Sequence, residues 1–272
     1  MAQRTARVGR LVLGSSRLFV IAGPCVIESA ALCRRVARHM VKVTRRLGIP
    51  YVFKASYDKA NRTSGKSFRG PGWHEGLKIL AGLREEFGVP VVSDVHTVEQ
   101  AQEAGAVLDC LQVPAFLCRQ TDLVQAAARA GKAVNLKKGQ FLAPWDMKNV
   151  IEKAALAGAK NILVTERGTS FGYNRLVSDM TALPVLQALG HPVVFDATHS
   201  AQQPGGLGTA TGGSREMAAL LARAAAAAGA DGLFIEVHPN PDEALSDGPN
   251  SLALRDVERV LETCLAIRSA IA

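Results

Sequence analysis

The sequence predicts an α/β protein, a (β/α)8 TIM barrel preceded by a short N-terminal β-hairpin. Three observations carry this prediction: eight short apolar runs recur along the chain, helix-like segments lie between them, and the eight units fill about 250 residues, the usual size of such a barrel. Because the runs are apolar without strict alternation, they are typical of strands covered on both faces, as a parallel sheet requires. A doubly wound open sheet is the structural alternative.

The segment before the first long apolar run is predicted to form the hairpin. In VGRLVLGSSRLFV, two apolar runs flank a Gly-Ser-Ser sequence that is typical of a turn. We therefore assign residues 1–17 to the hairpin and residues 18–272 to the barrel, which we expect to be the catalytic domain. Residues 1–17 contain four arginines and no acidic residue, so an organelle transit peptide is the alternative interpretation.

The strands are predicted where Val, Ile, Leu and Phe cluster, and the helices between them often end at a glycine such as Gly48 or Gly88. The predicted strands are 18–23, 51–56, 89–94, 107–113, 133–136, 161–165, 192–196 and 232–237. The most distinct helices are 28–47, 72–87, 121–130, 214–228 and 252–271.

The charge balance favours small anionic ligands over nucleic acid. The chain has 32 Lys and Arg against 24 Asp and Glu, a formal charge of +8, which by itself would suit a nucleic-acid binder. However, no Lys/Arg run, zinc-finger spacing or aromatic-interleaved basic strand accompanies this charge. A basic barrel that binds nucleic acid is the non-enzymatic alternative, and scattered cations are explained equally well by anionic small molecules.

Neither a membrane span nor a disulfide framework is expected. The longest uninterrupted apolar run, near 18–22, is far shorter than the roughly 20 residues that cross a bilayer. The cysteines are odd in number and scattered, which favours a reducing compartment, so we expect a cytoplasmic protein. They are Cys25, Cys33, Cys110, Cys118 and Cys264.

Reactive side chains follow every predicted strand, at the end where barrel enzymes place their chemistry. Each one alone has an ordinary structural explanation, such as a small buried cysteine or a solvated lysine. Their coincidence at one rim predicts an active site. The residues are Cys25, Lys54, Lys59, Asp94, His96, Arg119, Lys137, Lys138, Glu166, Arg167, Asp196, His199, Glu236 and His238.

With Arg62 included, the rim has seven cationic side chains, which is more than a neutral substrate requires. The sequence therefore predicts polyanionic ligands such as phosphates. Segment KANRTS at 59–64 combines ammonium, guanidinium and hydroxyl groups, a mixture that suits a phosphate, although an exposed polar turn has the same composition. The glycine-rich segment 205–214 is expected to be a mobile lid, and a backbone cradle for phosphate is its alternative.

Three residues of the rim and one residue of the loop that follows the last predicted strand could together hold a divalent metal ion. Cys25, His199, Glu236 and Asp247 offer a thiolate, an imidazole and two carboxylates, a mixed donor set that suits zinc, iron, manganese or cobalt without choosing among them. No closely spaced metal motif supports this assignment. The competing ligands or acid–base groups are Asp94, His96 and His238.

Seven longer motifs follow one another along the chain. They are AGPCVIES at 22–29, FKASYDKANRTS at 53–64, VPAFLCRQTDL at 113–123, NLKKGQFLAPWDM at 135–147, ERGTSFGYN at 166–174, FDATHS at 195–200 and EVHPNPDEALSDGPN at 236–250.

Together these motifs resemble the family of 3-deoxy-D-manno-octulosonate 8-phosphate synthases, also called 2-dehydro-3-deoxyphosphooctonate aldolases. The resemblance runs from about residue 19 to residue 255. It implies a (β/α)8 barrel, usually a homotetramer, that condenses phosphoenolpyruvate with D-arabinose 5-phosphate and water and releases phosphate. The product of that reaction enters lipopolysaccharide biosynthesis. The nearest enzymatic rival is the related heptulosonate 7-phosphate synthase family, whose phosphate loop typically reads KPRTS where this chain has KANRTS.

The resemblance also assigns roles by motif. Lys137 and Arg167 would clamp phosphoenolpyruvate, with Lys54 near the reacting carbons, and Arg119 would reach the sugar phosphate of a neighbouring subunit. The segment Pro114, Ala115 and Phe116 would lie beside phosphoenolpyruvate, and the arabinose 5-phosphate contacts would be Lys59, Asn61, Arg62 and Thr63.

Cysteine at position 25 distinguishes the metal-dependent branch of the family from the metal-free branch, which has asparagine there. The resemblance therefore implies a metal site of Cys25, His199, Glu236 and Asp247, although the DGPN sequence at Asp247 is similar to both branches. The chemistry of an enol ester requires no lysine Schiff base, so Lys54 and Lys137 are expected to supply charge or protons. The expected proton carriers are Asp94, His96 and His199.

Overall fold

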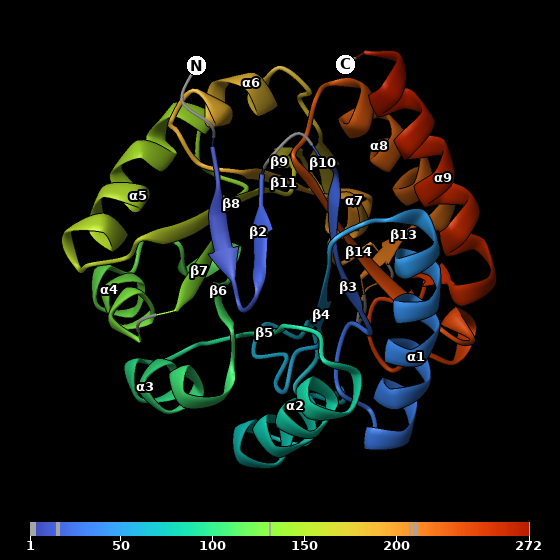
Figure 1. The fold of residues 1–272 in the computed structure, drawn as a ribbon, viewed down its shortest axis with the longest axis horizontal. Coiled ribbons are helices and arrows are strands. Elements are labelled where there is room, and N and C mark those ends of the chain that lie inside the picture. The colour runs from blue at the N-terminus through green and yellow to red at the C-terminus, as the bar shows by residue number, and fades with distance from the viewer. Residues whose placement is uncertain (1–3, 15–16, 131, 207, 209–210, 272) are drawn as a thin grey trace.

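Eight parallel strands close into a barrel in the computed structural model, which describes residues 4–14, 17–130, 132–206, 208 and 211–271 (Figure 1). The ring closes because the last barrel strand, β14, pairs with both β3 and β11. This closure confirms the predicted (β/α)8 barrel and excludes the open sheet. The barrel strands are β3 (Phe19–Gly23), β4 (Tyr51–Lys54), β5 (Val91–Asp94), β6 (Cys110–Val113), β7 (Ala133–Lys137), β8 (Asn161–Glu166), β11 (Val193–Asp196) and β14 (Gly232–His238).

Helices surround the barrel on its outer face (Figure 1). The first of them begins where the Ser29 side chain accepts a hydrogen bond from the Leu32 backbone N–H, and it ends at Gly48, whose φ of 67° suits glycine. The α-helices are α1 (Ala30–Leu47), α2 (Trp73–Phe87), α3 (Val98–Val107), α4 (Thr121–Arg129), α5 (Met147–Leu156), α6 (Ala182–Gln187), α7 (Ala197–Ser200), α8 (Arg215–Ala227) and α9 (Leu254–Ala270). The 3-10 helices are η1 (Ala115–Leu117), η2 (Pro144–Asp146) and η3 (Pro241–Glu243).

The N-terminal hairpin pairs β1 (Ala6–Val8) with β2 (Leu11–Leu13), so its turn is Gly9–Arg10. The predicted Gly-Ser-Ser turn was therefore misplaced; Ser15 and Ser16, like residues 1–3, lie outside the described residues. Gly9 has a φ of 55°, which a tight two-residue hairpin turn requires and glycine adopts readily. The assignment of 1–17 and 18–272 to two domains stays a prediction.

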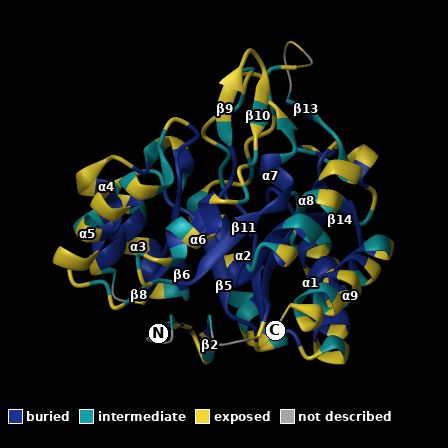
Figure 2. Ribbon diagram, turned by 90° about the horizontal axis from the view of Figure 1, so that it is seen from above, coloured by how far each residue is buried: buried dark blue, intermediate teal, exposed yellow. Residues whose placement is uncertain are grey.

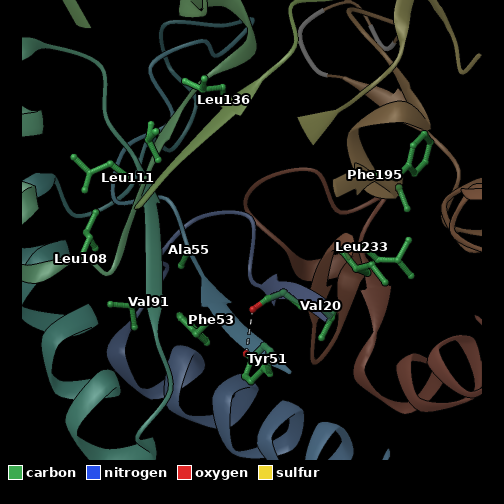
Figure 3. Packing of buried hydrophobic residues seen from close by; sticks show 14 of the residues in the cluster. Val20, Tyr51, Phe53, Ala55, Val91, Leu108, Leu111, Leu136, Phe195 and Leu233 are labelled. Atoms are coloured by element: carbon green, nitrogen blue, oxygen red, sulfur yellow. Dashed lines mark hydrogen bonds between the residues drawn. The ribbon is translucent and has the colours of Figure 1, made fainter. Parts of the chain in front are cut away.

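Alternation along the barrel strands explains why they are apolar throughout. In β3, Phe19 and Ile21 belong to a cluster inside the barrel with Val8 of the hairpin, whereas Val20 belongs to the larger cluster beneath the helices. Figure 3 shows part of the larger cluster, including Tyr51, whose hydroxyl donates a hydrogen bond of 3.0 Å to the Ala22 carbonyl. Both faces of each strand are thus buried, as the sequence pattern predicts.

The two ends of the barrel carry different structures. Figure 2 shows the exposed hairpin of β9 (Thr169–Gly172) and β10 (Arg175–Val177) at one end and the N-terminal hairpin at the opposite end. Two shorter pieces, β12 (Gln202–Gln203) and β13 (Gly212–Gly213), pair antiparallel, and β15 (Leu252–Ala253) adds to β14. Within the described ranges, no helix combines the length and apolarity needed to cross a bilayer.

Candidate active site

A pocket opens where the barrel strands end at their carboxyl termini, and most of the predicted site residues meet there. It has two adjoining chambers that share several lining residues. The first chamber is lined by the predicted residues Lys54, Lys59, Asn61, Asp94, His96, Pro114, Ala115, Phe116, Lys137, Arg167 and His199. The second adds Arg62, Thr63 and Asp247.

Asp196 organises one side of the pocket from the end of β11. Its Oδ2 atom accepts hydrogen bonds from Lys137 Nζ at 2.5 Å and from His199 Nδ1 at 2.7 Å, and its Oδ1 atom accepts one from the His199 backbone N–H at 2.9 Å. All three residues are buried. Burial opposes charge on Asp196, but His199 and Lys137 outweigh it and hold the pKa of this carboxyl well below its usual range. Because His199 Nδ1 is bonded to Asp196, the other ring nitrogen, Nε2, faces the carboxylates of Glu236 and Asp247.

Lys54, at the end of β4, lies between two acidic side chains of the pocket. Its ammonium donates to Glu236 Oε1 and to the Cys25 carbonyl, each at 3.1 Å, and lies 3.9 Å from Asp94 Oδ2. Burial favours the neutral form of Asp94, yet Lys54 and the neighbouring cations keep its pKa far below the ordinary value. Burial likewise opposes charge on Glu236, but His199, Lys54 and Lys59 lower its pKa, so both carboxylates are ionised beside a cation that has 1% of its side chain exposed.

Three of the four predicted metal ligands form a tight cluster. One ligand atom each from Cys25, Glu236 and Asp247 lies within 4.8 Å of the others. His199, the fourth, approaches this cluster with Nε2 at 3.4 Å from Glu236 Oε1 and 3.8 Å from Asp247 Oδ2. Burial, followed by the nearby carboxylates, raises the pKa of the Cys25 thiol well above its usual value. A positive ion at the cluster would favour the thiolate instead.

The donor set fits a divalent cation on two further observations. Glu236 Oε2 is buried and has no hydrogen-bond partner among the residues that the structure describes, although a buried carboxylate oxygen ordinarily has one. Asp247 adopts a φ of 50°, a left-handed backbone conformation that is uncommon outside glycine. Gln202 Nε2 donates a hydrogen bond of 2.9 Å to Asp247 Oδ1. The chain thus holds Asp247 in a strained position that directs its other oxygen toward Cys25.

The loop after β4 brings its polar residues to the second chamber, as predicted from KANRTS. Lys59 Nζ lies 3.8 Å from Glu236 and 3.9 Å from Asp247, so it joins the loop after β4 to the acidic cluster. Arg62 Nη1 donates to Ser246 Oγ at 2.6 Å. The same hydroxyl lies 2.9 Å from Cys25 Sγ. Ser246 therefore connects the loop to the cysteine of the cluster.

Arg167 and Lys138 are neighbours in the fold but differ in accessibility. Arg167 lines both chambers, and its Nη2 donates to Gln202 Oε1 at 2.8 Å, while Nη1 is buried with no hydrogen-bond partner among the described residues. Lys138 is completely buried, lies 3.5 Å from Glu166 Oε2 and donates to Thr169 Oγ1 and to two backbone carbonyls. Only Arg167 of these two cations faces the pocket.

The segment after β6 forms one wall and then leaves the site. Pro114, Ala115 and Phe116 line the first chamber, and Phe116 keeps 55% of its surface exposed. Arg119, three residues further on, is exposed and borders neither chamber; its carbonyl accepts from Lys153 Nζ at 2.9 Å. Within one chain, Arg119 is therefore not brought to the other site residues.

The two remaining histidines of the rim lie in different surroundings. His96 lines the first chamber, and its Nδ1 lies 3.2 Å from Gln100 Oε1. His238 is turned away from the cluster: Nε2 lies 3.4 Å from Glu28 and Nδ1 lies 2.6 Å from the Asn240 carbonyl. His96 thus fits the predicted acid–base role geometrically, and His238 supports the loop that follows β14.

Comparison with known proteins adds the family. The model of the DAHP synthetase I family matches residues 7–271. The chain belongs to the DAHP synthetase I family. Its relatives include proteins named 2-dehydro-3-deoxyphosphooctonate aldolase from Geotalea uraniireducens (strain Rf4), 59% identical over 96% of both chains, and from Desulfosudis oleivorans (strain DSM 6200 / JCM 39069 / Hxd3), 60% identical over 94% of this chain and 92% of the relative. A protein of the same name from Geobacter metallireducens (strain ATCC 53774 / DSM 7210 / GS-15) is 57% identical over 97% of both.

In this member of the DAHP synthetase I family, the pocket also includes residues that sequence reasoning missed. Gln112 and Gln140 line the first chamber, and Gln202 lines the second and holds both Arg167 and Asp247. Ser246 bridges Cys25 and Arg62. A signal did exist for Gln112, because a lone amide inside the apolar run of β6 costs free energy unless it is bonded.

Proposed function

We propose that this protein condenses phosphoenolpyruvate with D-arabinose 5-phosphate and water to give 3-deoxy-D-manno-octulosonate 8-phosphate and inorganic phosphate. The observation that carries the proposal is one pocket at the carboxyl ends of the strands, lined by Lys54, Lys137 and Arg167, in which Lys54 is bonded to Glu236 and to the Cys25 carbonyl. The name carried by relatives that are 56–60% identical along nearly the whole chain supports the same reaction. Its product would enter lipopolysaccharide biosynthesis.

Lys137 and Arg167 would bind the phosphate and carboxylate of phosphoenolpyruvate, with Lys54 near its reacting carbons. Phosphoenolpyruvate is already an enol ester, so its terminal carbon attacks the aldehyde without a Schiff base. The new carbon–carbon bond leaves positive character at the ester carbon, which water captures. The resulting hemiketal phosphate collapses and expels phosphate. Asp94 or His96 would carry the protons, since each lines the first chamber. His199 would do so only in protein without a bound metal ion, because its Nδ1 is bonded to Asp196 and its Nε2 would be a ligand.

The second chamber would bind the phosphate of arabinose 5-phosphate. Lys59, Asn61, Arg62 and Thr63 line it and provide the guanidinium, ammonium, amide and hydroxyl donors that hold a phosphate. Arg62 bonds to Ser246 in the structure, so its guanidinium would exchange this contact for the sugar phosphate. Segment 205–214 flanks the chamber at Gly205 and Thr211 and is proposed as its lid; Leu207, Thr209 and Ala210 lie outside the described residues.

Cys25, His199, Glu236 and Asp247 would hold one divalent ion, of zinc, iron, manganese or cobalt. When bound, such an ion polarises an aldehyde or a water molecule. The chain's own residues orient the site around it: Asp196 fixes the ring of His199, and Lys54 and Lys59 balance the charge of Glu236.

The assay that tests this function measures phosphate released from phosphoenolpyruvate and either arabinose 5-phosphate or erythrose 4-phosphate, with and without a chelator. We expect release with the pentose phosphate, loss of activity after chelation and recovery with added metal ion. Faster turnover of erythrose 4-phosphate would contradict arabinose 5-phosphate as the substrate and would favour the reaction of the heptulosonate 7-phosphate synthases. Full activity in metal-stripped protein would show that the condensation requires no metal ion, and the proposed reaction itself would stand.

Arg119 is proposed to act in a neighbouring subunit of a homotetramer. Its exposure beside the wall of the pocket supports this proposal, because the side chain is outside its own pocket. Co-expression of Arg119→Ala with Lys137→Ala tests it. Each variant alone should be inactive, whereas mixed tetramers should regain activity in sites that combine an intact Lys137 with a neighbour's Arg119. Equal inactivity of the mixture would show that Arg119 does not complete a neighbour's site, and full activity of Arg119→Ala alone would place it outside the reaction.

We further propose a cytoplasmic location. Five free cysteines in the described structure suit a reducing compartment. Fractionation of cells that produce the protein would test this, and recovery from an oxidising compartment would contradict it.

A further inference from the structure

Four consecutive strands of the barrel share a buried chain of side-chain hydrogen bonds. Thr165 Oγ1 on β8 donates to Asn135 Oδ1 on β7 at 2.7 Å, and Asn135 Nδ2 donates to Gln112 Oε1 on β6 at 2.9 Å. Gln112 Nε2 then donates to Asp94 Oδ1 on β5 at 2.6 Å. The first three residues are 0% exposed, so the chain runs through the interior to a carboxylate that faces the pocket.

The strand register places three of these side chains in one layer, whereas Thr165, which pairs with Lys137, lies in the next layer toward the carboxyl end of β8. Asp94 pairs with Gln112, and Gln112 pairs with Asn135, across adjacent strands. Residues paired in this way lie at the same height and point to the same face of the sheet. The geometry of the layer is thus fixed by the barrel itself, which suits a set of residues that must hold a neighbour in place.

The chemistry of the groups gives the chain a single direction. An ionised carboxylate only accepts, so Gln112 must present its NH2 group to Asp94 and its oxygen to Asn135. Asn135 must then present its own NH2 group to Gln112, which leaves its oxygen for the hydroxyl of Thr165. Every donor points toward Asp94, and reversing any one amide would bring two donors or two acceptors together.

Asp94 is held on its other side by different groups. Ser56 donates to Asp94 Oδ2, and Lys54 Nζ lies 3.9 Å from the same oxygen. The further charged or titratable groups that act on it are Lys59, Lys137, His96 and Tyr57. The cations supply charge from several directions, whereas the Gln112 amide is the group that fixes Oδ1. Orientation of the carboxylate therefore depends on the chain, and its ionisation depends mainly on the lysines.

We propose that Gln112, Asn135 and Thr165 are positioning residues: they form one directional relay that sets the orientation of the Asp94 carboxylate beside Lys54 at the floor of the pocket. The inference rests on the proposed condensation, in which Asp94 faces the reacting atoms. Thr165 would then affect the reaction although it lines neither chamber in the described structure. A purely structural role would instead affect stability without changing turnover of the folded enzyme.

The test uses the full chain with phosphoenolpyruvate and arabinose 5-phosphate. Thr165→Val keeps the shape of the side chain but removes the donor, so Asn135 Oδ1 loses its partner and only the bond to Gln112 still holds the Asn135 amide. We expect kcat to fall about tenfold, the scale of one hydrogen bond, with KM within about twofold of the parent. The conservative variant Thr165→Ser keeps the hydroxyl and should recover most of this loss.

A double-mutant cycle then separates the relay from independent effects. Gln112→Met removes the last donor and should lower kcat by about ten- to hundredfold, because this hydrogen bond is made to a charged group. Adding Thr165→Val to Gln112→Met should lower kcat no further, since Thr165 acts only through Gln112. Additive losses, or full activity of Thr165→Val, would overturn the relay.

Crystal structures of the parent and Thr165→Val provide a readout that does not depend on activity. We expect the amides of Asn135 and Gln112 to be displaced without reversing, and the Asp94 carboxylate to leave its present orientation. An unchanged Asp94 carboxylate, still bonded to Gln112 Nε2, would overturn the inference. Failure of the parent protein to release phosphate would instead refute the proposed function, and the structural comparison would still decide the relay.

Discussion

Replacing Asp196 by asparagine should destabilise the protein far more than the loss of one surface charge. The Asp196 carboxylate is 0% exposed and accepts from Lys137 Nζ, His199 Nδ1 and the His199 backbone. Asn has the same size, so Asp196→Asn leaves no cavity. It removes the negative charge and offers an NH2 group to partners that are themselves donors. Lys137 would remain as a buried cation without its carboxylate.

The expected cost follows from that uncompensated charge. Breaking a buried ion pair by removing one partner costs about 3–5 kcal/mol, whereas an exposed substitution usually changes stability by less than about 0.5 kcal/mol. Replacing both members should be milder, because the double variant Lys137→Met/Asp196→Asn buries no charge at this position. We expect the double variant to recover at least half of the stability that Asp196→Asn loses.

Urea unfolding followed by circular dichroism measures these differences through the shift of the midpoint at constant slope. Glu152→Gln, on the exposed side of α5, provides the matched control, since it also removes one carboxylate charge. A loss of less than about 1 kcal/mol for Asp196→Asn would refute the reasoning, as would a double variant less stable than the single one.

Three further outcomes follow from other parts of the structure. Arg167→Ala should lower kcat/KM by about 1.5–3 kcal/mol, the scale of a charged hydrogen bond, because Arg167 faces both chambers; an unchanged rate would place Arg167 outside the reaction. Tyr51→Phe should cost about 1–3 kcal/mol in urea unfolding by leaving the buried Ala22 carbonyl unpaired, whereas Tyr173→Phe, at a fully exposed position, should cost nothing measurable. Burial holds the pKa of His191 below its ordinary 6.5 in the folded protein. The contribution of His191 to stability is therefore complete above pH 6.5 and declines as the pH falls toward the pKa of the folded state, because the unfolded chain takes up the proton first. Between pH 7.5 and 5 the urea midpoint of His191→Gln should fall less than that of the parent, and an identical decline would contradict this cause.

The barrel could be predicted from sequence because its strands are buried on both faces. That pattern located all eight barrel strands, but several boundaries differ by one or two residues and one differs by three: the run 107–113 was assigned to a strand, whereas α3 continues to Val107 and β6 begins at Cys110. A short apolar run is equally compatible with the end of a buried helix, so composition alone cannot place the change. The exposed β9–β10 hairpin was not predicted, since it buries too little to leave an apolar period.

Most of the pocket could also be predicted, because the ends of parallel strands must meet at one rim. What the strand ends do not reveal is which side chains pair with one another. Lys137 is the last residue of β7 and Lys138 is the next residue, yet Lys138 is buried against Glu166 while Lys137 faces the pocket. Adjacent residues point to opposite sides of a strand, so two consecutive lysines could not both face the ligands.

The pairing of buried charges changes how the ligands can be bound. Lys137 lies against Asp196, and Lys54 lies against Glu236, so these cations already have carboxylate partners within the protein. A single buried cation would lose its proton or destabilise the fold, and the acids prevent this. The cations that the pocket can offer to a phosphate with fewer competing acids are therefore Arg167 and Arg62, whose bonds in the structure are to neutral groups. Of the groups proposed to bind the substrate anions, Arg167 and Arg62 should therefore contribute more to affinity than Lys137, and Lys54 should act mainly on the atoms that react.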